Sequence, residues 1–157
     1  MDEEAESERL LGCVVNQLQN LELLIRVFLH NNRASGEPAA DLAAIEATPL
    51  GSVVPLNAFS DYDSLTSLFA RMNGHPLAQA AEVRIDPGII TLRDALAHGR
   101  KCARGPGLPF RLIKFGRPRD GSVAVEFNAI VTIDWLRKEG ERVKAACEQL
   151  LRLVGAA

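Results

Sequence analysis

The fold of this chain is constrained most by two long stretches, one near each end, in which apolar residues recur every three or four positions. This spacing places them on one face of an α-helix, so it predicts a long helix over residues 4–29 and another from about Thr132, which is a suitable N-terminal cap. Two such helices in one chain indicate a helical bundle. We expect them to pack antiparallel.

The region between these helices is predicted to contain shorter ones. Residues 38–47 are expected to form a short helix, whereas residues 49–57 are not, because proline and glycine interrupt them. Ser60 or Asp61 is expected to cap a helix that ends at Asn73-Gly74.

A further helix is predicted directly after Asp86-Pro87, since proline fits the first helical turn. Ile89 and Leu92 supply apolar surface, and Gly99 supplies a stop. The last two turns of this helix read Arg93-Asp94-Ala95-Leu96-Ala97-His98, and they carry the candidate functional residues.

After this helix the apolar pattern changes to extended and alternating runs, over residues 110–115 and 123–127. Asp120-Gly121 lies between them and favours a tight reversal, so a β-hairpin is predicted between the helix ending at His98 and the last helix. The expected fold is therefore mainly α, a bundle of four or five helices with an inserted hairpin. A chain of 157 residues is the size of one domain, and we expect residues 1–6 to be disordered.

Composition excludes several classes of protein. With 47% apolar and 24% charged residues the chain is expected to fold into a globule. The three cysteines form no Cys-x-x-Cys pair and the three histidines are scattered, which argues against disulfides and zinc, so no metal or cofactor is expected. The acidic N-terminus does not resemble a signal peptide and no apolar run reaches ~20 residues, so we expect a cytoplasmic protein without membrane association.

The segment from Arg93 to Gly99 resembles the signature of the HEPN superfamily. In that family an arginine, followed by a polar residue, precedes a histidine by a few positions near the end of a helix. The general layout agrees over residues 8–154, while the specific likeness covers seven residues. The resemblance implies a HEPN-like bundle of four or five helices.

The resemblance also implies an activity. HEPN ribonucleases cleave RNA without a metal, through the RNA's own 2′-hydroxyl, and leave a cyclic phosphate. Here it implies that His98 transfers a proton, that Arg93 neutralises the phosphorane charge and that Asp94 orients His98. Asp94 and His98 are four positions apart and can pair on one helical face. Arg93 lies about 140° round the helix from His98, so a homodimer is expected to complete the site.

The distribution of charge favours an RNA partner. From Arg93 to Arg119 there are eight basic residues and one acidic residue, a net charge of +7 in a chain of net charge −2. Concentrated positive charge beside the motif is what phosphate binding requires. The residues expected to bind RNA are Arg100, Lys101, Arg104, Arg117 and Arg119.

The first interpretation is therefore a metal-independent endoribonuclease, a toxin of a toxin–antitoxin or defence system with a cognate antitoxin. One alternative is a non-catalytic HEPN interaction or regulatory module, and another is a nucleotide- or ligand-binding bundle.

In the family's toxins that are silenced by AMP attachment, a tyrosine follows the histidine by two positions. Arg100 stands there in this chain, so that form of control lacks its acceptor. Glu22 and Arg26 are interpreted as a structural ion pair.

Overall fold

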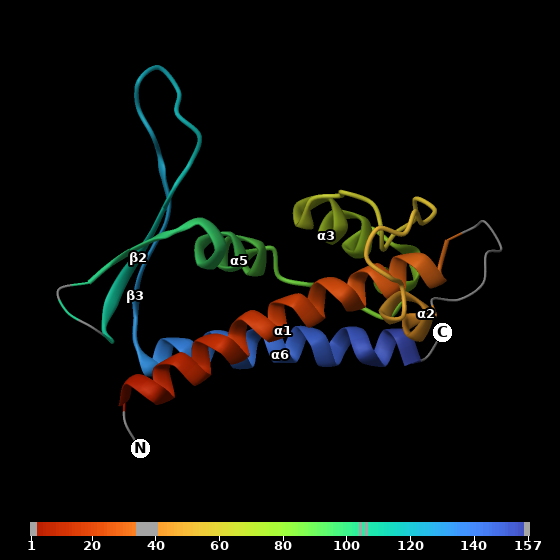
Figure 1. Ribbon diagram of the computed structural model, residues 1–157, viewed down its shortest axis with the longest axis horizontal. Coiled ribbons are helices and arrows are strands. Elements are labelled where there is room, and N and C mark those ends of the chain that lie inside the picture. Colours follow the sequence, from red (N-terminus) through yellow and green to blue (C-terminus); the bar gives the residue numbers. More distant parts are fainter. Residues whose placement is uncertain (1–2, 34–40, 104, 106, 156–157) are drawn as a thin grey trace.

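The computed structural model describes residues 3–33, 41–103, 105 and 107–155. The chain is mainly helical with one small antiparallel sheet (Figure 1). No helix among the described residues is long and apolar enough to cross a membrane. The elements in chain order are α1 (Glu3–Asn31), α2 (Leu42–Glu46), α3 (Leu65–Asn73), α4 (Pro76–Ala80), α5 (Gly88–His98), β1 (Arg100–Cys102), β2 (Phe110–Phe115), β3 (Val125–Val131) and α6 (Ile133–Gly155).

The described part of the chain thus contains six helices, rather than the four or five expected, because α2 and α4 are separate short helices of five residues each. The short helix predicted over residues 38–47 is present as α2, which Asp41 caps by accepting a hydrogen bond from the Ala44 N–H at 3.0 Å. Residues 38–40 of that prediction lie outside the described residues.

The two long helices, α1 and α6, lie side by side and run in the same direction (Figure 1). Arg137 Nη2 lies 3.3 Å from Glu6 Oε1, and the Cys147 thiol lies 3.6 Å from the carbonyl oxygen of Gln17. Contacts therefore advance along both helices in the same order, and the antiparallel prediction is wrong. The elements between the two helices return the chain to the end at which α1 begins, so α6 starts from there.

Helix α1 begins at Glu3, so residues 3–6 of the segment expected to be disordered are helical, whereas residues 1 and 2 lie outside the described residues. Glu6 is buried, and its carboxylate accepts hydrogen bonds from Arg9 at 2.9 Å and from Arg137 at 3.3 Å. This ion pair between α1 and α6 gives the first turn a partner that the acidic sequence alone does not reveal.

The main core lies between α1, α3, α5 and α6, where burial of apolar surface provides the chief stabilisation. Its fully buried side chains include Leu21, Ile25, Phe28, Leu68, Met72, Ile89, Leu92, Val143 and Leu150. A second, smaller cluster attaches the sheet to α5 and α6, and it consists of Ala95, Leu112, Val131 and Leu136.

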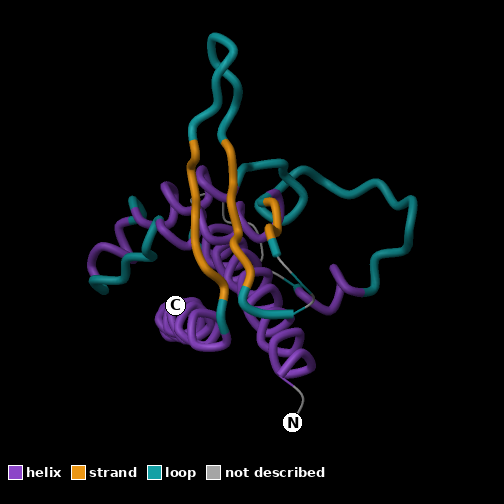
Figure 2. Tube along the Cα trace, turned by 90° about the vertical axis from the view of Figure 1, so that its left-hand side faces the viewer, coloured by secondary structure: helices purple, strands orange, loops and turns teal. Residues whose placement is uncertain are grey.

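The predicted hairpin is confirmed, with β2 and β3 antiparallel. Asp120 and Gly121 have φ values of 50° and 74°, and the bridge between Arg119 and Ser122 closes the two-residue reversal. Beyond β2 and β3 the arm of the hairpin extends away from the helices (Figure 2). A third strand, β1, pairs with β2 to give the order β1-β2-β3. It was not predicted, because three residues are too few to show alternation.

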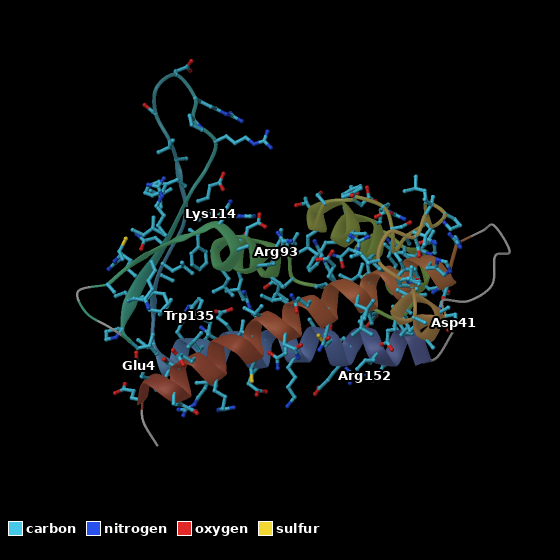
Figure 3. The ribbon with its side chains drawn as sticks, viewed as in Figure 1. Glu4, Asp41, Arg93, Lys114, Trp135 and Arg152 are labelled. Atoms are coloured by element: carbon cyan, nitrogen blue, oxygen red, sulfur yellow. The ribbon has the colours of Figure 1, made fainter. Side chains whose placement is uncertain are left out.

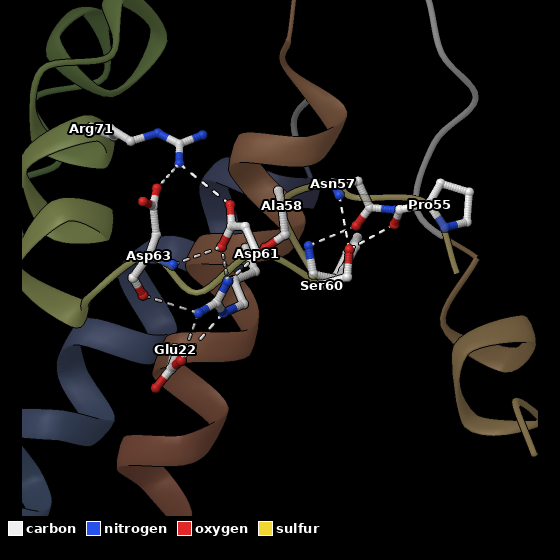
Figure 4. A network of polar contacts seen from close by, with 10 residues as sticks. Glu22, Pro55, Asn57, Ala58, Ser60, Asp61, Asp63 and Arg71 are labelled. Atoms are coloured by element: carbon white, nitrogen blue, oxygen red, sulfur yellow. Dashed lines mark hydrogen bonds and ion pairs between the residues drawn. The ribbon is translucent and has the colours of Figure 1, made fainter. Parts of the chain in front are cut away.

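A network of polar contacts that includes Glu22 and Asp61 fixes the segment before α3 to α1 (Figure 4). Its central residue is Arg26, whose side chain is only 12% exposed. Its guanidinium donates hydrogen bonds to Asp61 Oδ1 and to the carbonyl oxygen of Ala58, both at 2.7 Å, and to Glu22 Oε1 at 3.1 Å. The Glu22–Arg26 pair is thus part of a structural network. Because Asp61 is engaged here, the cap of α3 is Ser64, and the prediction of Ser60 or Asp61 is wrong.

Candidate functional site

Helix α5 buries Ile89, Leu92 and Ala95, which leaves Asp94 and His98 on the side away from the core. The helix ends at His98, and the N–H of the following residue, Gly99, donates to the Ala95 carbonyl oxygen at 2.8 Å. A Cβ at Gly99 would lie 2.3 Å from that oxygen, so only glycine allows the chain to turn here into β1. This turn places His98 where the helix meets the sheet.

An open cleft of about 910 Å³ lies between α5 and the hairpin. Asp94 and His98 form the wall on the α5 side, and His98 is exposed. The opposite wall comes from the hairpin, and its residues are Lys114, Phe115, Gly116, Arg117, Pro118, Arg119, Ser122, Val123, Ala124 and Glu126.

Within the cleft, Lys114 is paired with Glu126. The hydrogen bond to Glu126, followed by the attraction of the Glu126 and Asp94 charges, raises the pKa of the Lys114 ammonium, with partial desolvation opposing the effect. A Cβ at Gly116 would lie 2.5 Å from Glu126 Oε1, so this glycine leaves the space that the carboxylate occupies. The charge of Lys114 is therefore neutralised within the protein.

Arg117 and Arg119 differ from Lys114 in that their side chains have no hydrogen bond or ion pair with any residue the structure describes. Both are exposed and line the same cleft as His98. The cleft therefore combines an imidazole with two uncompensated guanidinium groups. Guanidinium groups bind phosphate oxygens through their planar fork of donors.

Arg93 is also on α5, but its side chain does not line this cleft (Figure 3). Its Nη1 donates to Asp94 Oδ1 at 3.2 Å, and its side chain lines a separate hollow of about 320 Å³ between α1 and α5. Asp94 therefore bonds to Arg93, and the predicted pair between Asp94 and His98 is not formed among the described contacts. In one chain Arg93 and His98 face two different hollows, as their angular separation on the helix indicated.

The other residues expected to bind RNA divide between two faces of the sheet. Arg100 lies over the ring of Phe115, with Cζ 5.2 Å from the ring centroid, in a hollow that also contains His98. Lys101 lies over Phe110 at 4.7 Å, in another hollow with Glu4 and Glu8. Arg104 is outside the described residues.

Among the cleft residues that were not predicted as site residues, three contribute a charge or an aromatic ring, and these are Lys114, Phe115 and Glu126. Lys114 belongs to the basic segment, and its charge was the available signal. Phe115 was interpreted only as part of an apolar strand. Glu126 enters the cleft because the register shifts between Lys114 and Phe115, and such a bulge is not visible in the sequence.

Among the described residues, no group of three or more histidine, cysteine, aspartate or glutamate side chains is arranged to hold a metal ion.

The fold and site define a mainly helical protein in which a small antiparallel sheet forms one wall of a basic cleft. No protein-family model, curated protein or solved structure matches the chain. The chemistry of the cleft therefore has to be inferred from its own residues.

Proposed function

We propose that this protein is a metal-independent endoribonuclease of the HEPN type, which binds RNA between α5 and the hairpin. The observation that carries the proposal is that His98 shares a cleft with Arg117 and Arg119, whose charges no described carboxylate neutralises. RNA supplies the matching anion as a row of phosphates. We propose a cytoplasmic toxin or defence role, in reducing surroundings that suit the three free cysteines.

The proposed reaction is an intramolecular phosphoryl transfer. A base takes the proton of a 2′-hydroxyl, the freed oxygen attacks the adjacent phosphorus, and the bond from phosphorus to the 5′-oxygen breaks as that oxygen gains a proton. The products are a 2′,3′-cyclic phosphate and a 5′-hydroxyl. His98 accepts or donates one of the two protons, and Arg117 and Arg119 stabilise the extra negative charge of the phosphorane.

Cleavage is expected to be independent of divalent metal ions. Single-stranded RNA incubated with the protein in excess EDTA should be cut at the same rate as in magnesium, and the 5′ fragment should end in a cyclic phosphate. Electrophoresis and mass spectrometry of the fragments provide the measurement. Activity that disappears in EDTA and returns with magnesium would contradict the mechanism.

The hairpin guanidinium groups are expected to provide RNA affinity. The double variant Arg117→Ala, Arg119→Ala should bind RNA about tenfold more weakly, with a slope of log K against log salt that is shallower by roughly 1.4, for two phosphate contacts on a single strand. Fluorescence anisotropy at several salt concentrations measures both. The matched control is Arg84→Ala with Arg152→Ala, which removes the same charge from exposed positions outside the cleft. Equal losses in the two double variants would show that only net charge matters.

We also propose a homodimer, because the Arg93 side chain is 40% exposed and does not reach the cleft of its own chain. A second copy can bring Arg93 to the His98 of the first. Light scattering at micromolar concentration is expected to give twice the 17.1 kDa of one chain. A monomer that cleaves RNA would show that Arg117 and Arg119 are sufficient without Arg93.

One observation favours the alternative of a non-catalytic interaction module. Between α2 and α3 four large side chains are at least 80% exposed, and these are Leu50, Val53, Leu56 and Tyr62. Exposed apolar surface of this kind is typical of a protein-binding segment. In a toxin the same surface would suit a cognate antitoxin. A folded protein that binds a protein partner but cuts no RNA would favour this alternative.

A further inference from the structure

The cleft has an aromatic residue at its edge that the proposed chemistry does not use. Of the six phenylalanines in the chain, only Phe115 is exposed, at 36%. The exposed ring of Phe115 makes no contribution to either apolar cluster. Arg100 lies over this ring, with Cζ 5.2 Å from its centroid, and the part of the ring that remains exposed at the rim of the basic cleft is available to a ligand.

The surroundings of this ring are specific. Phe115, Arg100 and His98 line one hollow of about 310 Å³, together with Gly116, Pro118 and Val123. This hollow adjoins the larger cleft, since all of its lining residues except Arg100 also line that cleft. A group bound on Phe115 would therefore be next to a phosphate bound beside His98.

We propose that Phe115 and Arg100 form a stacking site for one unpaired nucleobase of an RNA strand whose phosphate lies beside His98. The proposal rests on the function proposed above and specifies its substrate as single-stranded. Every base has an aromatic face that can stack on a phenyl ring, and the planar guanidinium of an arginine stacks in the same way. Bases inside a duplex are already stacked on both faces, so a paired strand cannot use the site.

Two oligonucleotides separate base binding from phosphate binding. The first is a short oligouridylate with 2′-O-methyl groups, which cannot be cleaved by 2′-hydroxyl attack. The second has the same number of phosphates but carries abasic sugars. Phe115→Leu keeps an apolar side chain and removes the aromatic face, so it should weaken binding of the first oligonucleotide about 5- to 150-fold and change binding of the second by less than about twofold.

Three further variants complete the test. Phe115→Tyr retains the ring and should bind both oligonucleotides as wild type does. Tyr62→Leu removes another exposed aromatic side chain, in the loop before α3, and should also have no effect. Arg100→Lys keeps the positive charge but removes the planar guanidinium group that would stack on a base. It should weaken binding of the base-bearing oligonucleotide selectively, which keeps the test valid if Phe115→Leu does not fold.

Parallel cleavage assays on unmodified RNA distinguish this inference from the proposed function. If wild type cleaves RNA but the Phe115 and Arg100 variants bind both oligonucleotides as it does, the stacking site is refuted and the nuclease remains. Selective loss of base binding in a protein that never cleaves would retain the stacking site and refute the nuclease. Absence of binding to either oligonucleotide would refute both.

Discussion

Replacing His98 with alanine is expected to lower the rate of RNA cleavage by roughly 10²–10⁴, because a positioned proton-transfer group contributes about that factor. Affinity for RNA should stay within about twofold of wild type, since Arg117 and Arg119 supply the phosphate contacts. His98 is exposed and its side chain has no hydrogen bond with a described residue, so its loss leaves no buried group unsatisfied. Single-turnover cleavage and fluorescence anisotropy measure the two effects separately.

His75→Ala is a suitable control for this variant. His75 caps α4, with Nδ1 accepting from the Leu77 N–H at 3.3 Å, and it does not line the cleft. Its replacement is expected to reduce stability slightly and to leave cleavage unchanged. If His98→Ala is folded and as active as wild type on every RNA tried, the motif is structural and the non-catalytic interpretation should replace the nuclease.

Replacing Arg26 with alanine is expected to lower the free energy of unfolding by about 2–4 kcal/mol. The change removes the donor of the Ala58 carbonyl oxygen and the shortest hydrogen bond of the Asp61 carboxylate in a partly buried site, which leaves Asp61 with the Asp63 N–H at 3.2 Å and Arg71 at 3.8 Å. For a domain of this size the midpoint of thermal unfolding should fall by roughly 5–15 °C. Urea denaturation followed by circular dichroism gives the free energy directly.

Arg71→Ala provides a matched comparison, because Arg71 pairs with Asp61 and Asp63 in the same network (Figure 4). Its side chain is 44% exposed, so its ion pairs are worth no more than about 1 kcal/mol. If Arg26→Ala and Arg71→Ala have similar, small effects, the network does not anchor the segment before α3. Arg26→Lys should be intermediate, since lysine keeps the charge but loses the fork of donors.

The elements that could be predicted from the sequence are those with a strong local signal. Pro87 and Gly99 mark the ends of α5, and the Asp120-Gly121 reversal follows from the φ values that these two residues tolerate. Thr132 was expected to cap the last helix, and its hydroxyl does accept from the Trp135 N–H at 3.1 Å. In each case one or two residues determine the local backbone.

The features that could not be predicted depend on tertiary structure. The periodicity of apolar residues identifies the buried faces of α1 and α6 but not whether the two helices run in the same or in opposite directions, so the parallel arrangement was not predicted. Asp94 has possible partners one position before it and four positions after it. Local spacing does not reveal that it bonds to Arg93, with His98 left facing the hairpin. The proximity of Phe115 to His98 likewise depends on how the sheet packs on α5.

The parallel arrangement of α1 and α6 has a consequence for how the protein is made. No short loop can join parallel neighbours, and the Glu6–Arg137 contact connects residues 131 positions apart. Burial of the apolar face of α1 that carries Leu21 and Ile25 is therefore completed only when the last helix packs on it, and closing so long a loop slows folding. Helix α5 and the hairpin are part of the connection that brings α6 back. Because α5 and the hairpin are close in sequence, the two walls of the cleft can pack on each other early, through Ala95 and Leu112, and the docking of α6 through Leu136 then fixes them in the fold.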